Sequence, residues 1–377
     1  MNKPHSPVPS SPLLDHCPAT LPANAYYDAD HFAREQKTIW ARNWVYAARA
    51  NDMAAMSMRR LSVAGENLIL VKDAEGAFTC FHNTCRHRGA ELCQASEKRL
   101  KSKLIACPYH GWTYDLKGRL VRTPFVSITP DFKKEEQGLF EVAVKEWNGF
   151  VFVCLADDPP DFDGVADLDN WPMRDLATGH VMVKEIACNW KIFWENYNEC
   201  LHCPGIHPEL SAMVPVYGKG YMAANEAPDW TPDTPLPTHQ LKDGAGTWSM
   251  TGALCGPAFP GLTREQLAAG SHFVTLLPTM YIVAHADFVR AVSLNALGPE
   301  RTELRAEFLF APETLAAPGF DPKPVVDFAT LVMLQDGAAC EMNQRGLHSS
   351  RYSHGTLMPQ EFEVHRFHEW IRRHDQN

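Results

Sequence analysis

The amino-acid sequence predicts an α+β protein in which a small antiparallel β domain precedes a larger domain of sheet and helix. Three observations support this prediction. Short apolar or alternating runs separated by turns fill residues 44–154, a polar, proline-rich stretch follows at Asp157–Gly164, and strand-like runs then give way to a long helical C-terminus. Strands followed by helices indicate an antiparallel sheet with helices on one face.

We expect residues 1–43 to form an N-terminal arm and a helix that pack on the larger domain. The first 25 or so residues are rich in Pro and Ser, which is typical of a loose segment. Asp28 or Asp30 can cap a helix through Phe32, Ile39 and Trp40, where the apolar spacing is roughly helical. The first residues lack the apolar stretch of a signal peptide, so none is predicted.

Residues 44–156 predict the small β domain. Turns are expected at Asp73–Gly76 and Asp115–Gly118, because Asp and Gly favour tight chain reversal. The clearest strands are expected at Asn67–Val71, Phe78–Phe81, Lys103–Ala106 and Gly149–Cys154.

Residues 157–377 predict the larger domain. A helix is expected around Trp190–His202, a proline-rich irregular region from about Ala227 to Gly261, and a helical C-terminus from about Pro324. The strands are expected at Phe273–Leu277, Met280–Ala284, Ala291–Leu297 and Thr302–Leu309.

Composition restricts the class of partner. The formal net charge of −10 argues against nucleic acid, because phosphate binding needs a basic surface. No run of about 18 apolar residues is present, so we expect a cytoplasmic protein without a membrane partner. The 11 cysteines, an odd number in a chain without an export signal, favour reduced thiols over a disulfide framework, and some of these thiols are expected to bind metal.

Two short segments each carry one cysteine and one histidine. Cys85 and His87 form Cys-x-His, Cys107 and His110 form Cys-x-x-His, and 19 residues separate the two pairs. Two thiolates and two imidazoles can hold tetrahedral zinc or an iron–sulfur cluster. Common zinc fingers pair Cys with Cys and His with His, whereas a mixed-ligand [2Fe–2S] cluster takes one Cys and one His from each loop. The pattern therefore favours the cluster over zinc.

The cluster segments carry a family resemblance. Cys85–Ala90 and Cys107–Trp112 resemble, nearly residue for residue, the cluster loops of the large (alpha) subunits of Rieske ring-hydroxylating oxygenases. Gly89 and Gly111 would let backbone amides approach the cluster sulfurs. The resemblance implies that the small domain is a Rieske domain. It also implies that the larger one is a helix-grip catalytic domain holding one non-haem iron.

A second candidate metal site lies in the predicted helix. His202 and His207 are five residues apart, and Pro204 and Gly205 are expected to break the helix so that both imidazoles turn toward one metal. Two His and one carboxylate form the facial triad of non-haem iron(II) oxygenases, which leaves positions free for dioxygen and substrate. Glu199 lies one helical turn before His202 and would share its face.

The spacing Glu-x-x-His-x4-His also resembles the iron helix of Rieske oxygenases. In that family the acidic residue before the first His usually bridges the iron His to a cluster His of a neighbouring subunit. The resemblance therefore implies that Glu199 is the electron bridge, toward His110, and that the third ligand lies elsewhere. Asp336 is the candidate, because the family's ligand aspartate opens a similar C-terminal helix, and Glu341 is the alternative.

The two sites together imply partners. A Rieske cluster stores one electron, whereas inserting one oxygen atom from dioxygen needs two electrons from outside. The sequence shows no dinucleotide fingerprint after a strand and no second cysteine run for a cluster. We therefore expect a separate flavin and iron–sulfur reductase that uses NADH or NADPH. The resemblance further implies a homotrimer in which the cluster of one subunit serves the iron of the next.

The substrate is suggested by two further runs. Glu195–Pro204 and Cys340–Ser349 resemble the branch that oxidises choline, glycine betaine, carnitine and proline betaines, although Leu201 stands where relatives often carry Tyr. Most ring-hydroxylating members have Asp at the position of Glu199. The expected reaction is monooxygenation of an N-methyl carbon with loss of formaldehyde, which is a demethylation. Aromatic side chains that could surround the cation are Phe193, Trp194, Tyr197, Tyr217 and Trp248.

Two other functions are compatible with the motifs. One is hydroxylation, dihydroxylation or O-demethylation of an aromatic acid by the same two metal sites. The other is a non-catalytic Rieske electron carrier, which would leave the roughly 220 residues after the small domain without a task.

Overall fold

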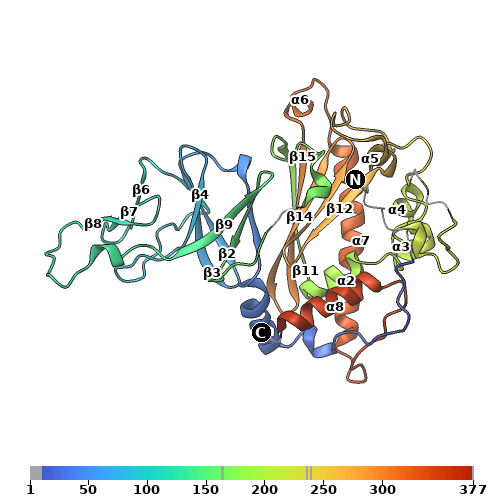
Figure 1. Cartoon of the computed structure of the whole chain (residues 1–377), viewed down its shortest axis with the longest axis horizontal. Coiled ribbons are helices and arrows are strands. Elements are labelled where there is room, and N and C mark those ends of the chain that lie inside the picture. The colour runs from blue at the N-terminus through green and yellow to red at the C-terminus, as the bar shows by residue number, and fades with distance from the viewer. Residues whose placement is uncertain (1–10, 163–164, 235–236, 238–239, 376–377) are drawn as a thin grey trace, which may run out of the picture.

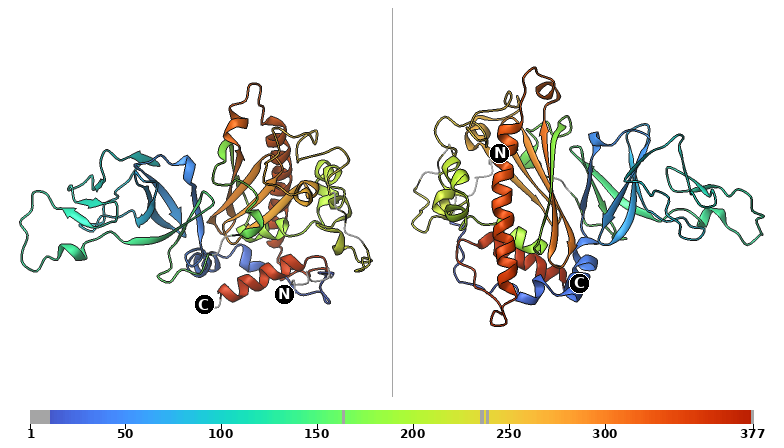
Figure 2. Two further views of the ribbon diagram at one scale, coloured as in Figure 1. Left: turned by 45° about the horizontal axis from the view of Figure 1, so that its top comes forward. Right: turned by 180° about the vertical axis from the view of Figure 1, so that it is seen from behind.

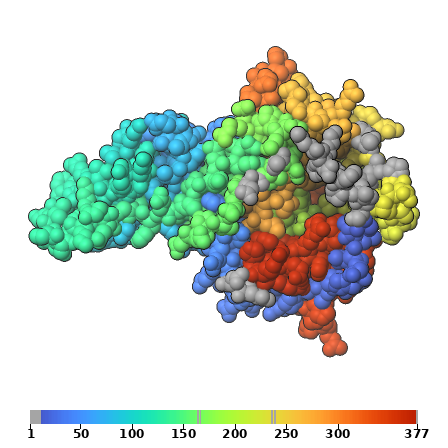
Figure 3. Space-filling model, in the orientation of Figure 1, coloured from blue at the N-terminus to red at the C-terminus, as the bar shows by residue number. Residues whose placement is uncertain are grey.

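The computed structural model describes residues 11–162, 165–234, 237 and 240–375. It has the predicted α+β class: a β region lies at one end of the long axis, and a sheet covered by helices lies at the other (Figure 1). In the space-filling view the β region projects from the rest as a tapering arm (Figure 3). No described helix is both long and apolar enough to cross a lipid bilayer.

The projecting region contains two antiparallel sheets. The larger has the strand order β1-β10-β9-β4-β3-β2-β5, and the smaller has the order β6-β7-β8. The smaller sheet stands at the outer end of the region (Figure 1). The strands are β1 (Val45–Arg49), β2 (Ser57–Val63), β3 (Glu66–Lys72), β4 (Phe78–His82), β5 (Glu97–Arg99), β6 (Leu104–Ala106), β7 (Thr113–Asp115), β8 (Leu120–Arg122), β9 (Glu141–Trp147) and β10 (Phe150–Cys154).

The second region is built on one five-stranded antiparallel sheet with the order β11-β15-β14-β13-β12. Its central strands are almost wholly buried, because both faces of the sheet are covered. One face packs with α2, α7 and α8, and the other packs with β10 and with residues 168–176. The strands are β11 (Ala177–Ile186), β12 (Ser271–Leu276), β13 (Met280–His285), β14 (Val289–Gly298) and β15 (Arg301–Phe310).

The helices gather on one face of this sheet, as predicted, and α7 runs along it (Figure 2, right). Gly337 of α7 allows a close approach to β11, since a Cβ atom there would lie 3.1 Å from Ile186 Cγ2. The helices are α1 (Ala29–Glu35), α2 (Trp190–Tyr197), α3 (Cys203–Ile206), α4 (Pro208–Met213), α5 (Arg264–Ala269), α6 (Pro312–Leu315), α7 (Lys323–Leu347) and α8 (Phe362–Asp375).

The N-terminal segment is tied to the helical layer by a buried ion pair. The Asp28 side chain caps α1 by accepting from the His31 amide at 2.8 Å. At the other end of α1, Glu35 is fully buried, and its carboxylate lies 2.6 Å from Nζ of Lys191 on α2. The pair fixes α2, the helix that leads into the site described next. The domain bounds 1–43, 44–156 and 157–377 stay a prediction.

Candidate metal centres

The first four candidate ligands lie in two loops with the same backbone hydrogen bonds. In each loop the cysteine amide donates to the carbonyl five residues later, and the glycine amide four residues later donates back to the cysteine carbonyl. The Cys85 amide donates to the Ala90 carbonyl and the Cys107 amide to the Trp112 carbonyl, both at 2.8 Å. The Gly89 amide donates to the Cys85 carbonyl at 2.9 Å, and the Gly111 amide donates to the Cys107 carbonyl at 3.1 Å. Gly89 and Gly111 have φ of +77° and +70°, which other residues rarely adopt.

The four side chains fit a two-iron cluster better than a single ion. The rings of His87 and His110 are 4.7 Å apart between centroids, and the Cys85 and Cys107 thiols interact with each other. Yet no three of these four ligand atoms lie within 4.8 Å of one another, whereas tetrahedral zinc would hold all four within about 4 Å. A pair of thiols separated from a pair of imidazoles is the donor arrangement of a Rieske cluster.

Two buried groups in these loops are suited to metal ligation. Nδ1 of His87 is buried and has no hydrogen-bond partner among the described residues. Burial raises the pKa of Cys85 and the neighbouring Cys107 thiol raises it further, although the Tyr114 hydroxyl at 3.2 Å opposes this. Bound iron would accept the lone pair of His87 Nδ1, and it would stabilise the thiolate form of Cys85 and so lower its pKa.

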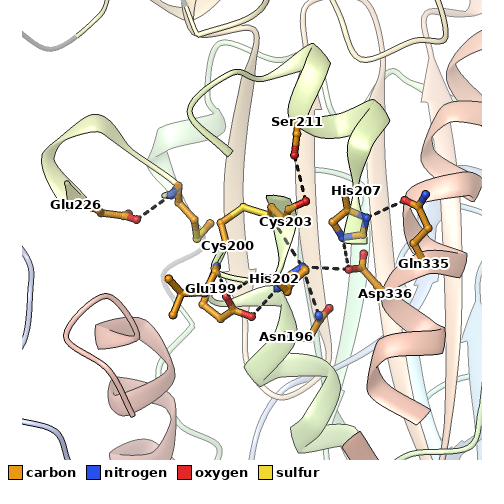
Figure 4. The surroundings of a disulfide bond; sticks show 12 residues. Asn196, Glu199, Cys200, His202, Cys203, His207, Ser211, Glu226, Gln335 and Asp336 are labelled. Carbon is orange, nitrogen blue, oxygen red and sulfur yellow. Dashed lines mark hydrogen bonds and ion pairs between the residues drawn. A yellow bond between two sulfur atoms is a disulfide. The ribbon is translucent and has the colours of Figure 1, made fainter. Parts of the chain in front are cut away.

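The second site brings together His202, His207 and Asp336. In the described part of the chain they form the one group of three potential ligands whose atoms all lie within 4.8 Å of one another. Asp336 Oδ1 lies 2.8 Å from His207 Nε2 and 3.5 Å from His202 Nε2 (Figure 4). Both imidazoles thus direct Nε2 to the same carboxylate. Two imidazoles and one carboxylate form the donor set of a non-haem iron(II) site.

The local fold around the two histidines differs from the expected helix. The helix α2 ends at Tyr197, so the predicted continuation to His202 is wrong, and Glu199 contacts His202 across a turn instead of along a helical face. Pro204 does not break a helix but lies in the first turn of α3, where its missing N–H is tolerated. His202 therefore precedes α3 and His207 follows it.

Asp336 also lies in an unexpected position. It was expected to open a helix, but it lies in the middle of α7, so that expectation is wrong. The middle of a long helix holds the carboxylate on a rigid element. The alternative ligand, Glu341, accepts a hydrogen bond from the Ala187 amide at 3.1 Å and does not join the cluster of His202 and His207.

Each histidine is oriented by a hydrogen bond on its other nitrogen. His202 Nδ1 lies 2.5 Å from Glu199 Oε1, and His207 Nδ1 lies 2.8 Å from Gln335 Oε1. Such bonds fix the ring orientation and leave Nε2 for the metal. Glu199 and Asp336 lie on opposite sides of His202 (Figure 4). Sequence reasoning missed Gln335, because only the packing of α7 against the α3 segment brings it to His207.

A disulfide joins Cys200 and Cys203, on either side of His202. The expectation of reduced thiols is therefore wrong for this pair. The Cys203 amide donates to the Cys200 carbonyl at 3.0 Å, and this turn brings the Cα atoms to 5.0 Å, within the usual range for a disulfide. The other nine cysteines are free, as expected.

Without a metal, the charges and hydrogen bonds of the second site favour a proton on His202. Burial disfavours a charge on His202, but hydrogen bonds to Asp336 and Glu199 raise its pKa to about 9. Burial also opposes the charge on Asp336, yet the two histidines lower its pKa below the usual range. The site thus favours a positive charge at its centre, which suits a metal cation.

We expect the affinity of the iron-free protein for Co(II) to rise from about pH 6 to about pH 8, by up to about tenfold per pH unit. The raised pKa keeps His202 protonated throughout this range, and the proton must leave before Nε2 can bind metal. Titration calorimetry in two buffers of different ionisation enthalpy should show release of about one proton. Asp336→Asn should abolish this binding, and an affinity independent of pH would contradict the assignment.

The triad borders a cavity of about 70 Å³ that has several aromatic side chains in its walls. Four of the predicted aromatic residues line it, namely Phe193, Tyr197, Tyr217 and Trp248. Trp194 does not, because it is fully buried and its indole N–H donates to the Pro278 carbonyl at 3.0 Å. Phe273 and Tyr281 also line the cavity, and sequence reasoning missed them because they lie on distant strands.

Comparison with known proteins gives two family matches. The model of the ring hydroxylating alpha subunit (catalytic domain) matches residues 173–376. The model of the Rieske [2Fe-2S] domain matches residues 43–133.

Similar proteins cover most of the chain. The glycine betaine monooxygenase oxygenase subunit of Pseudomonas aeruginosa strain UCBPP-PA14 is 29% identical, over 93% of this chain and 88% of its own. The carnitine monooxygenase oxygenase subunit of Acinetobacter pittii strain PHEA-2 is 28% identical, over 68% of this chain and 71% of its own. The crystal structure of a quaternary ammonium Rieske monooxygenase with an inhibitor has the same fold, with a TM-score of 0.72, 22% identity and 95% of both chains covered.

Proposed function

We propose that this chain, which belongs to the ring hydroxylating alpha subunit family, hydroxylates an N-methyl carbon of a quaternary ammonium compound. It is a Rieske-type oxygenase with a [2Fe–2S] cluster and a mononuclear iron. The observation that carries this proposal is the aromatic cavity beside His202, His207 and Asp336. A hydroxyl group on a carbon bonded to nitrogen gives an unstable hemiaminal. The hemiaminal therefore breaks down to formaldehyde, which carries the carbon of the hydroxylated methyl group, a proton and a tertiary amine.

We assign the metal ligands as follows. Cys85 and Cys107 hold one iron of the cluster, His87 and His110 hold the other, and His202, His207 and Asp336 hold the mononuclear iron. When bound, the cluster supplies one electron and the mononuclear iron activates dioxygen.

The protein's own groups position the reaction. Glu199 and Gln335 fix the rings of the two iron histidines through Nδ1. The ring centroids of Tyr197 and Tyr281 are 4.1 Å apart, and Phe193 stacks at 6.0 Å from Tyr281. Aromatic faces attract a quaternary ammonium cation, and these rings also exclude water from the methyl group that reacts.

We further propose that the electron passes between two copies of the chain. The second cluster loop lies between β6 and β7 at the outer end of the projecting region, whereas α3 and α4 lie at the far side of the other region (Figure 1). The ring of Tyr109, which is exposed, lies 3.7 Å from that of His110 between centroids, and the segment between β8 and β9 exposes Phe125 and Ile128. Such a surface favours contact with a partner protein.

A ring of identical subunits satisfies this geometry. A head-to-tail contact between the projecting region and the Glu199 side of a second copy closes into a ring under rotational symmetry. Leu201, two residues beyond Glu199, is 40% exposed and offers an apolar contact on the receiving side. The contact does not set the number of subunits, but the family resemblance implies three, so we propose a homotrimer with Glu199 as the bridge to His110 of the partner subunit.

The relatives are oxygenase subunits, which implies that a separate reductase delivers the electrons. We propose a reductase with a flavin and its own iron–sulfur cluster that uses NADH or NADPH, and a cytoplasmic location where these donors are available.

A formaldehyde-release assay tests the proposal. The purified protein, NADH and a surrogate reductase are supplied in turn with choline, glycine betaine, carnitine, a proline betaine and a methoxybenzoate. Formaldehyde should form from at least one of the methylated amines, and none should form when the reductase is omitted. If no methylated amine reacts and the methoxybenzoate is demethylated or hydroxylated, the chain oxidises aromatic acids and the proposal is wrong.

A further inference from the structure

We propose that Arg290 binds a carboxylate of the substrate, so that the chain selects methylated amino acids over simple methylated amines such as choline. This inference rests on the proposed function, because it concerns which part of a quaternary ammonium compound the cavity recognises. It adds a residue that sequence reasoning did not identify.

Arg290 is a buried cation in the wall of the cavity. It lies on β14, next to Val283 of β13 and Phe308 of β15, and it is 5% exposed. It lines the same cavity as the iron triad. Its guanidinium makes no hydrogen bond or ion pair with any residue that the structure describes, and its Nε is buried without an acceptor.

A buried guanidinium without a partner is costly, since the charge loses its water and gains nothing in return. The other buried cations have partners, although Arg49 also leaves its Nε without an acceptor. Arg49 donates to three backbone carbonyls at 2.7–3.2 Å, and Lys191 pairs with Glu35 at 2.6 Å. Of the three lysine and arginine side chains that are buried in the described part of the chain, Arg290 alone lacks a partner.

The groups that face Arg290 cannot supply the missing negative charge. Burial raises the pKa of Tyr281 to about 12, and burial also raises the pKa of Tyr197 and Tyr217, so all three stay neutral. Burial lowers the pKa of His285 well below its usual range, and the charge of Arg290 lowers it further. The cavity carboxylates Glu199 and Asp336 are bound to histidines.

A second unpaired donor lies in the same wall. Trp248 lines the cavity, and its buried indole Nε1–H has no acceptor among the described residues. Trp248 also packs against His285, at 5.3 Å between ring centroids, and His285 is itself close enough to Arg290 to feel its charge. An anion bound by the planar guanidinium of Arg290 would therefore also have the neutral indole N–H of Trp248 as a possible donor.

This arrangement suits a zwitterion. Its carboxylate pairs with Arg290, and its methylated nitrogen lies against the faces of Tyr197, Tyr281 and Phe193, beside the metal triad. Choline carries the cation without the carboxylate, so the unpaired guanidinium would repel it. Arg290 thus provides both an attraction to the accepted substrate and a penalty for the rejected one.

The test compares binding of charged and uncharged analogues. Calorimetric titration without oxygen measures the Kd of wild type and of Arg290→Met for glycine betaine, carnitine and choline. We expect Arg290→Met to raise the Kd of the two zwitterions by about 10-fold to about 100-fold, the usual range for a lost charged hydrogen bond, and to leave choline binding unchanged or tighter. Arg290→Lys keeps the positive charge but lacks the bidentate guanidinium, so it should raise the Kd of the zwitterions by a smaller factor.

Arg301→Met is the matched control. Arg301 lies on β15 of the same sheet, but it is exposed and pairs with Glu185 at 2.8 Å outside the cavity. It should leave all three Kd values unchanged. The visible spectrum of the cluster shows whether each variant is folded. If Arg290→Met does not fold, the Kd values of Arg290→Lys are compared with those of the wild type instead.

Two outcomes would overturn the role of Arg290. One is zwitterion binding that changes by less than about twofold in both Arg290 variants, and the other is wild-type protein that binds choline as tightly as glycine betaine. If the wild type instead oxidises only methoxybenzoate, the proposed function fails while the role of Arg290 remains testable. Binding of methoxybenzoate, but not of its uncharged amide, should then weaken in Arg290→Met.

Discussion

Replacing His202 by alanine is expected to remove the mononuclear iron and to lower turnover by more than about 1,000-fold, because the metal loses one of three protein ligands. The [2Fe–2S] cluster should remain, since its four candidate ligands lie in the loops of the projecting region. Metal analysis should therefore show loss of about one iron of three per chain. The visible spectrum of the cluster should be unchanged.

The carboxylates of α7 provide a matched pair for the same experiment. Asp336→Ala should behave as His202→Ala does, because its Oδ1 lies between the two histidines. Glu341→Ala, five residues further along the same helix, should keep its iron and its turnover, since Glu341 contacts the Ala187 amide instead. Iron retained in His202→Ala, or lost in Glu341→Ala, would refute the ligand assignment.

Replacing Glu199 by glutamine is expected to slow electron transfer to the iron by about 100-fold while both metal sites stay filled. The glutamine keeps the size of the side chain, but it loses the negative charge that accepts from His202 Nδ1 at 2.5 Å. Stopped-flow absorbance should show normal reduction of the cluster by dithionite. Its reoxidation by dioxygen and substrate should be slow.

The surface pair of Glu300 and His348 gives a control for Glu199→Gln. Glu300 also binds a histidine nitrogen, at 2.8 Å, but at an exposed position outside the cavity. Glu300→Gln should leave cluster reoxidation at the wild-type rate. If Glu199→Gln loses its iron but reoxidises normally after iron is restored, Glu199 only positions His202 and is not the bridge.

The features that the sequence predicts well are local in the chain. Each cluster loop is a short segment in which Cys and His are two or three residues apart, so spacing alone indicates the donor set. His202 and His207 were likewise found from their spacing, and the family resemblance indicated Asp336. The clearest strands, such as Phe78–Phe81 and Met280–Ala284, were placed within a residue or two because their apolar patterns are strong.

The features that the sequence missed depend on packing between distant segments. Gln335 reaches His207 only because α7 packs beside α3, and Arg290 faces the cavity only because β14 lies in the centre of the sheet. A lone arginine in an apolar run carries no sign that it lacks a partner. The edge strand β11 was not predicted because its residues are half exposed and lack a clear alternation.

A single-turnover experiment tests directly whether the cluster is an electron relay to the mononuclear iron. Protein with reduced cluster and iron(II), freed of reductase, is mixed with glycine betaine and dioxygen. We expect formaldehyde to form at up to about one molecule per mononuclear iron, with the cluster reoxidised in the same phase. Formaldehyde formed while the cluster remains reduced would contradict the relay.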